Sequence, residues 1–151
     1  MPAFDLGPVL TERLGVPISG RWVRLERLRP DHVPALHGLV NEGKEIVEWP
    51  LAAGQAMNVS DLGDHLFGLQ GLQLVVVQRE NERIVGLVQG MALDLRSGTI
   101  DLGVVFGSGG WRAGWPVEGV VLFLDYLISG LGVRKVYLEM AEETIGKAGG
   151  H

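Results

Sequence analysis

The chain has 151 residues, the size of one domain, and is long enough to bury a hydrophobic core. Its formal net charge of −5 and its pI near 5.3 argue against nucleic acid or an anionic membrane as the main partner. It contains no cysteine, which excludes disulfides, thiol nucleophiles and thiolate metal sites. No apolar run is as long as a membrane span, and no secretory-signal pattern opens the chain. We therefore expect a cytoplasmic protein with no membrane or nucleic-acid partner.

The first part of the chain predicts a strand followed by a helix. Residues 1–19 are punctuated by proline and glycine and are predicted to be irregular. Alternating apolar and polar residues predict a strand over residues 21–28. A helix is predicted next, with Asp31 as its N-cap and Pro34 in its first turn.

The following stretch has a weaker pattern. Residues 41–56 are predicted to form a connection with some helical character, which ends where a proline and a glycine interrupt it. Residues 59–69 have apolar side chains at helical spacing and predict a second helix that begins near Ser60 or Asp61.

Three strands are expected in the middle of the chain, over residues 72–78, 84–95 and 99–106. A charged segment at residues 79–83 and a turn at residues 96–98 separate them. Such short connections predict an antiparallel meander.

A helix and a last strand follow. Apolar residues recur at helical spacing over residues 117–131, and Gly130 and Gly132 are predicted to close the helix. Residues 133–140 then predict a fifth strand, and a strand–helix–strand connection places it parallel to its predecessor. The expected fold class is α/β (α+β): a twisted mixed sheet, with an antiparallel meander plus one parallel strand, and helices on both faces.

Residues 99–119 read T-I-D-L-G-V-V-F-G-S-G-G-W-R-A-G-W-P-V-E-G, a strand, a glycine-rich turn and a helix start. Such a turn leaves backbone N–H groups unpaired at the positive end of a helix dipole, which suits a phosphate group. A flexible connection that binds nothing has the same pattern. The P-loop motif is absent, and no G-x-G-x-x-G lies between a strand and a helix.

This stretch resembles the acyl-CoA-binding motif of the GNAT superfamily of N-acyltransferases, and in particular the branch that acetylates ribosomal-protein N-termini and related amines. That motif reads roughly E-I-G-Y and then W-G-K-G-Y-A-T-E-A. Here residues 100–104 read I-D-L-G-V and residues 111–119 read W-R-A-G-W-P-V-E-G. Pro116 stands where the motif has glycine or alanine, and it has no N–H to offer a phosphate. The residues in register are Trp111, Gly114, Trp115 and Glu118.

The resemblance extends further, because residues 131–140 read L-G-V-R-K-V-Y-L-E-M and are similar to the strand that follows this helix in the family. It covers roughly residues 20–140 and implies a GNAT-like domain there, between an irregular segment at residues 1–19 and a tail at residues 141–151. A complete member continues with an asparagine-containing loop, a helix and two strands, often with a tyrosine that protonates the leaving thiolate. We expect the given chain to be incomplete; supply of this layer by a partner and loss of catalysis are the alternatives.

The resemblance also implies site residues. Asp101 stands at the place of a strand glutamate that acts as general base, directly or through water; a strand-edge carboxylate bonded to a neighbour is the alternative. The two arginines considered for the CoA phosphates are Arg112, which is better placed, and Arg24. The residues expected to bind acyl-CoA are Gly103, Val104, Val105 and Phe106 through their main chain, and Trp111, Arg112, Ala113, Gly114, Trp115 and Val117 around the turn.

Glu48 and Trp49 lie in the region that borders the acceptor-amine pocket of the resembled branch. Their alternative reading is a tryptophan packed on the sheet beside a solvated glutamate. His32 and His37 are five residues apart, which does not place them on one helix face, and we predict no metal. Glu118 is expected to support the start of its helix rather than to contact substrate.

The sequence thus predicts an acyl-CoA-dependent N-acyltransferase, which moves an acetyl or similar acyl group from CoA to an amine of a protein N-terminus or a small molecule. The alternative is a non-catalytic acyl-CoA-binding or protein-interaction module with a GNAT-like fold. An open sheet edge predicts a homodimer.

Overall fold

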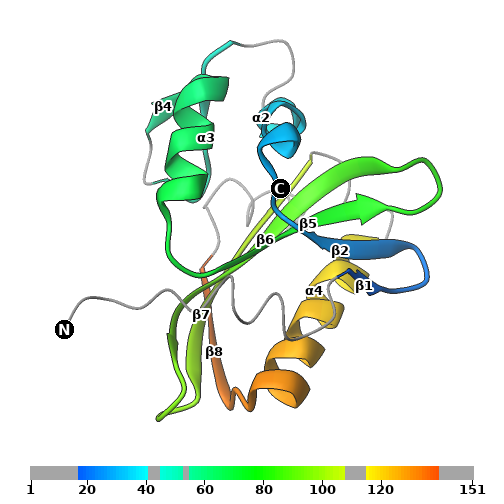
Figure 1. The fold of residues 1–151 in the computed structure, drawn as a ribbon, viewed down its shortest axis with the longest axis vertical. Helices are drawn as coiled ribbons and strands as arrows, with labels where there is room; N and C mark the ends of the chain where they lie inside the picture. The colour runs from blue at the N-terminus through cyan, green and yellow to red at the C-terminus, as the bar shows by residue number, and fades with distance from the viewer. Residues whose placement is uncertain (1–16, 41–44, 53–54, 108–114, 140–151) are drawn as a thin grey trace, which may run out of the picture.

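The computed structural model describes residues 17–40, 45–52, 55–107 and 115–139. In these ranges the chain forms a six-stranded sheet with helices on both faces (Figure 1). The strand order is β1-β2-β5-β6-β7-β8, and β3 and β4 form a separate two-stranded sheet. The six strands are β1 (Ile18–Ser19), β2 (Val23–Arg27), β5 (Leu72–Gln78), β6 (Arg83–Asp94), β7 (Thr99–Phe106) and β8 (Lys135–Glu139).

The helices lie in two layers. The 3₁₀ turn η1 (Pro30–His32) leads into α2 (Val33–Val40), which lies beside α3 (Val59–Gly68) on one face of the sheet (Figure 1). On the opposite face lies α4 (Trp115–Asp125), which continues into the π-helical turn η3 (Tyr126–Gly130). The expected mixed sheet with helices on both faces is confirmed.

The expected strand directions are confirmed as well. Strands β5, β6 and β7 form the antiparallel meander, because their short connections allow only neighbouring antiparallel pairs. Strand β8 pairs parallel to β7, with Thr99 opposite Lys135 and Gly103 opposite Glu139. The intervening helix crosses the sheet and returns the chain in the same direction.

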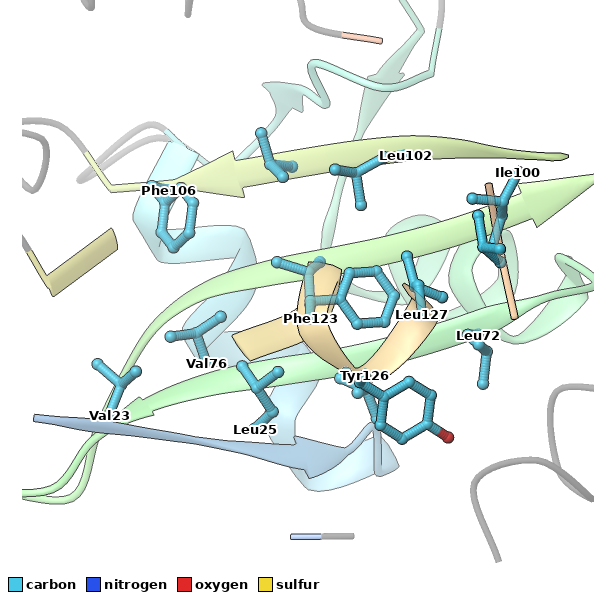
Figure 2. Packing of buried hydrophobic residues seen from close by; sticks show 14 of the residues in the cluster. Val23, Leu25, Leu72, Val76, Ile100, Leu102, Phe106, Phe123, Tyr126 and Leu127 are labelled. Carbon is cyan, nitrogen blue, oxygen red and sulfur yellow. The ribbon is translucent and has the colours of Figure 1, made fainter. Parts of the chain in front are cut away.

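Two hydrophobic clusters hold these layers together. Under α4, the side chains of Phe123, Tyr126 and Leu127 pack on the sheet, where they meet residues such as Leu25 and Val76 (Figure 2). The second cluster lies on the α2 and α3 face and contains Trp49 and eleven other buried residues. These two cores explain the nearly continuous apolar runs of the central strands, which are buried on both faces.

Strand β7 divides its side chains between the two faces with the period of two that a strand imposes. Ile100, Leu102, Val104 and Phe106 belong to the cluster under α4. Val105 belongs to the cluster under α2 and α3. The alternation therefore places Asp101 and Gly103 on the α2 and α3 face together with Val105.

The start of the first helix differs from the expectation that Asp31 is its N-cap. The helix α2 begins at Val33, and the backbone N–H of Arg29 donates to Nδ1 of His32 over 3.0 Å. Pro30 begins a 3₁₀ turn ahead of the helix, so Asp31 lies inside that turn and not before it. The Asp31 carboxylate instead accepts a hydrogen bond from the Arg29 guanidinium, 3.1 Å away.

The second helix begins where it was expected, because Ser60 and Asp61 lie in the first turn of α3. Its N-cap is Asn58, whose Oδ1 accepts from the backbone N–H of Asp61 over 2.8 Å. Residues 45–57 contain two short strands, β3 (Val47–Glu48) and β4 (Ala56–Met57), in place of the expected helical character. Two-residue strands have too few positions to show a period of two in the sequence.

The imidazole of His32 is buried, and its surroundings favour the neutral form. Burial, followed by the charge of Arg29, holds the pKa of His32 below its usual value of 6.5. Nδ1 accepts the Arg29 N–H, so protonation of that nitrogen would set two donors against each other. Glu26 Oε2 lies 3.8 Å from Nε2 and offsets this only in part.

Because the folded-state pKa of His32 is depressed, the unfolded chain takes up the proton first on acidification. The stabilisation is complete above about pH 6.5 and is lost as the pH falls through the folded-state pKa. We expect the free energy of unfolding to fall between pH 7.5 and pH 5 in urea titrations, and to fall less in His32→Asn, which keeps an acceptor but does not titrate. An equal fall in both proteins would show that His32 does not contribute.

Candidate functional site

The expected catalytic residue, Asp101, lies on β7, between β6 and the edge strand β8, and is partly exposed. Its direct cross-strand neighbours are Met91 on β6 and Tyr137 on β8. Directly opposed residues share one face of a sheet, so Met91 and Tyr137 flank Asp101 on the α2 and α3 face. Tyr137 is 50% exposed.

Gly103, one position further along this face, lets another segment approach the strand closely. A Cβ built on Gly103 would lie 3.1 Å from Cδ1 of Leu51 and 3.4 Å from Oε1 of Gln89. Leu51 follows the small strand β3, so the absent side chain brings the β3–β4 segment over β7. Because Gly103 has no side chain, Oε1 of Gln89 can also lie close to the β7 main chain.

A chain of amide groups crosses the sheet at this row. Gln73 on β5, Gln89 on β6 and Gly103 on β7 lie opposite one another. Nε2 of Gln89 donates to Oε1 of Gln73 over 2.7 Å, and Nε2 of Gln73 donates to the Leu66 carbonyl over 2.7 Å. Neither glutamine was predicted as a site residue from the sequence. The sequence pattern that could have found them is strand alternation, which places Gln73 and Gln89 among the mostly apolar residues on one face of β5 and β6.

The two predicted acceptor-contacting residues have different surroundings. Trp49 is completely buried in the cluster under α2 and α3, and its Nε1 has no hydrogen-bond partner in the described structure. Glu48 is exposed. No hydrogen bond or ion pair links either residue to Asp101 in the described ranges, and their contact with an acceptor stays a prediction.

Part of the predicted acyl-CoA turn can be placed. Trp115 begins α4, Pro116 is buried beside it, and Val117 is exposed on the next position. Proline suits a first helical turn, although it contributes no N–H there. The turn residues Trp111, Arg112, Ala113 and Gly114 lie outside the described ranges. Val104, Val105 and Phe106 form the buried end of β7 that leads toward this turn.

Glu118 connects the start of α4 to a distant part of the chain. Its Oε1 accepts hydrogen bonds from the backbone N–H groups of Trp22, over 2.8 Å, and Val23, over 2.9 Å. A carboxylate that accepts two N–H groups forms strong, charge-assisted bonds. Glu118 therefore ties the start of α4 to β2 and the residue before it. Its support of the helix start through the helix dipole stays a prediction.

Arg24 is less suited to phosphate binding than its charge suggests. Its guanidinium donates to the carboxylates of Glu26 and Glu82, and these hydrogen bonds raise the pKa of Arg24 above its ordinary value. A phosphate would have to compete with both carboxylates.

His32 and His37 both have hydrogen-bond partners within the fold. Nε2 of His37 lies 3.1 Å from the carbonyl oxygen of Met57, and His32 accepts from Arg29. The described ranges contain no group of three His, Cys, Asp or Glu side chains that could hold a metal ion. In the same ranges, no helix is both long and apolar enough to cross a membrane.

The fold was compared with known proteins. The chain matches no protein-family model, and no curated protein matches its sequence. Among solved structures, a candidate ribosomal-protein-serine acetyltransferase from Vibrio cholerae matches with a TM-score of 0.68 and 13% identity, over 90% of this chain and 80% of that one. An acetyltransferase of the GNAT family from Bacillus anthracis matches with a TM-score of 0.68 and 14% identity, over 86% and 76%.

A further candidate acetyltransferase matches with a TM-score of 0.62 and 22% identity over 80% of this chain, which spans 64% of that protein's length. Structural matches at identities this low establish a common fold and leave the activity open. The sheet order, the parallel β7–β8 pair and these matches together lead to one conclusion: the chain has the fold of the GNAT acetyltransferases.

Proposed function

We propose that the chain is an acyl-CoA-dependent N-acetyltransferase that moves an acetyl or similar acyl group from CoA to an amine. The observation that carries the proposal is the position of Asp101 within the GNAT fold. Asp101 is partly exposed on β7, and Gly103 is the next residue of that strand on the same face of the sheet. The acyltransferase folds that match the chain support acyl transfer as the reaction class.

The reaction joins the amine nitrogen to the acyl carbon and breaks the carbon–sulfur bond of the thioester. The amine must present its lone pair, so an acceptor that arrives as an ammonium ion first gives one proton to water, and a second proton leaves the nitrogen as the new bond forms. Asp101 takes that proton directly or through a water molecule. Main-chain N–H groups of β7 stabilise the oxyanion of the tetrahedral intermediate. The CoA thiolate then takes up a proton and leaves as the thiol, with the amide as the second product.

The acceptor is an amine that carries positive charge before it reacts. Asp101 and Glu48 are acids, and the chain is acidic overall, so a cationic acceptor is attracted to it. The Vibrio cholerae protein is named for a ribosomal-protein serine, and a protein N-terminus is one acceptor that we propose for this chain. A small-molecule amine satisfies the same charge preference.

The test is the release of CoA thiol from acetyl-CoA with a panel of amines, which includes an alanine-initiated peptide, a serine-initiated peptide and an aliphatic diamine. We expect release that depends on both acetyl-CoA and one class of amine. If acetyl-CoA binds in calorimetry but no amine causes release, the chain is the non-catalytic module, which the missing N–H of the buried Pro116 favours. If acetyl-CoA does not bind, neither proposal holds.

A further inference from the structure

The hydrogen-bonded pair of Gln73, which is half-buried, and Gln89, which is buried, has no role in the reaction described above, although it lies on the same face as Asp101. Gln89 is 3% exposed. Burying an amide is costly unless its polar atoms find partners, so a buried glutamine on a strand needs an account of each atom. Nε2 of Gln89 has a partner in Gln73, and among the described residues no donor is seen for its Oε1.

The direction of the amide chain follows from its backbone end. The Leu66 carbonyl can only accept, so Gln73 must turn Nε2 toward it. Oε1 of Gln73 is then the atom that faces Gln89, and it can only accept from Nε2 of Gln89. The Leu66 carbonyl therefore fixes which end of each side-chain amide is the nitrogen and which is the oxygen. A glutamine without such a partner would leave this assignment open.

The remaining atom, Oε1 of Gln89, lies at the β7 end of this chain. It is 3.4 Å from the position that a Cβ on Gly103 would occupy. No described residue donates a hydrogen bond to this oxygen. Asp101 is two residues before Gly103 on the same face, roughly 6 to 7 Å along the strand. Two oxygens that can only accept hydrogen bonds, one of them charged, thus belong to neighbouring positions on the α2 and α3 face of the sheet.

We propose that Oε1 of Gln89 binds an N–H group of the acceptor amine and holds its nitrogen beside Asp101. This inference rests on the proposed function and specifies its substrate class. A primary amine, when neutral, has two N–H groups and one lone pair. It donates one N–H to Gln89 and one to Asp101, and its lone pair stays available for the acyl carbon. A hydroxyl has one donor and cannot satisfy both oxygens.

The experiment measures amine binding in the presence of free CoA, so that no transfer occurs. The probes are a trialanine amide with a free N-terminus and the same peptide with an N,N-dimethylated N-terminus, which carries the same charge at pH 7 but only one N–H. We expect the dimethylated peptide to bind at least about tenfold more weakly, a loss that one hydrogen bond to a charged donor accounts for. The side-chain amide resonance of Gln89 should shift on addition of the primary amine.

Two variants test the residue itself. Gln89→Met keeps the side-chain length and removes the acceptor; it should weaken binding of the primary amine about tenfold and abolish the preference over the dimethylated peptide. Gln78→Met, on β5 outside this row, is the matched control and should bind as the wild type does. CoA affinity should be the same in all three proteins.

Equal binding of the two peptides by the wild type, an unchanged Gln89 resonance, or no amine binding at all would overturn the inference, and the peptide comparison needs no variant to fold. Thiol release at the same rate in the wild type and in Gln89→Met would support the proposed function and reject the role of Gln89. A shifted Gln89 resonance and a clear peptide preference without any thiol release would support the amine site and reject the transferase.

Discussion

Replacing Asp101 by asparagine is expected to lower kcat for acyl transfer by about 10²- to 10⁴-fold, the usual contribution of a general base. The amide cannot accept the proton that the amine must lose. It keeps the size of the carboxylate on β7, so the sheet and the affinity for acetyl-CoA should be unchanged. The measurement is the initial rate of thiol release at saturating acetyl-CoA and amine, with calorimetry of acetyl-CoA on the same protein.

Two control variants separate the base from a general effect of charge. Asp64→Asn removes an exposed acid on α3 and should leave kcat within about twofold, because solvent and salt screen an exposed charge. Asp101→Glu restores the residue of the resembled motif and should retain most of the activity. A wild-type rate in Asp101→Asn would show that the carboxylate is only a strand-edge group.

Phe123→Ala is expected to lower the free energy of unfolding by about 3–5 kcal/mol, the cost of removing a large aromatic side chain from a core. The ring is completely buried between α4 and the sheet, and its centroid lies 6.3 Å from that of Tyr126 (Figure 2). A Cβ on Gly90 would approach its Cζ to 3.3 Å, so the ring rests directly on β6. Urea unfolding followed by circular dichroism measures the loss.

The matched control is Val121→Ala on the same helix. Val121 is 54% exposed, and a surface substitution of this kind changes stability by about 0.5 kcal/mol or less. Similar losses in the two variants would mean that α4 does not pack on the sheet through Phe123.

Much of the fold could be predicted because its patterns are local. The meander follows from three β-rich runs separated by charged or glycine-containing turns, and each run is found at nearly the expected residues. The parallel direction of β8 follows from the helix before it. Gly132, with φ of 73°, ends that helix in the left-handed region that favours glycine.

The candidate site could be predicted less well, because it depends on strand register. Asp101 and Gly103 can be selected by their motif, but the row that connects Gln73, Gln89 and Gly103 exists only once the three strands are aligned. Glu118 and Trp22 are likewise 96 residues apart in sequence. The N-cap Asn58 was missed for a simpler reason, since several residues near it are equally good caps.

The most direct measurement is the mass of an alanine-initiated peptide after incubation with acetyl-CoA and the purified chain, with fragmentation to locate the added group. The account predicts one acetyl group on the N-terminal nitrogen, formed with an equal amount of free CoA and strongly reduced in Asp101→Asn. An unmodified peptide and unmodified diamine in the presence of bound acetyl-CoA would contradict the assignment of acyl transfer to this fold.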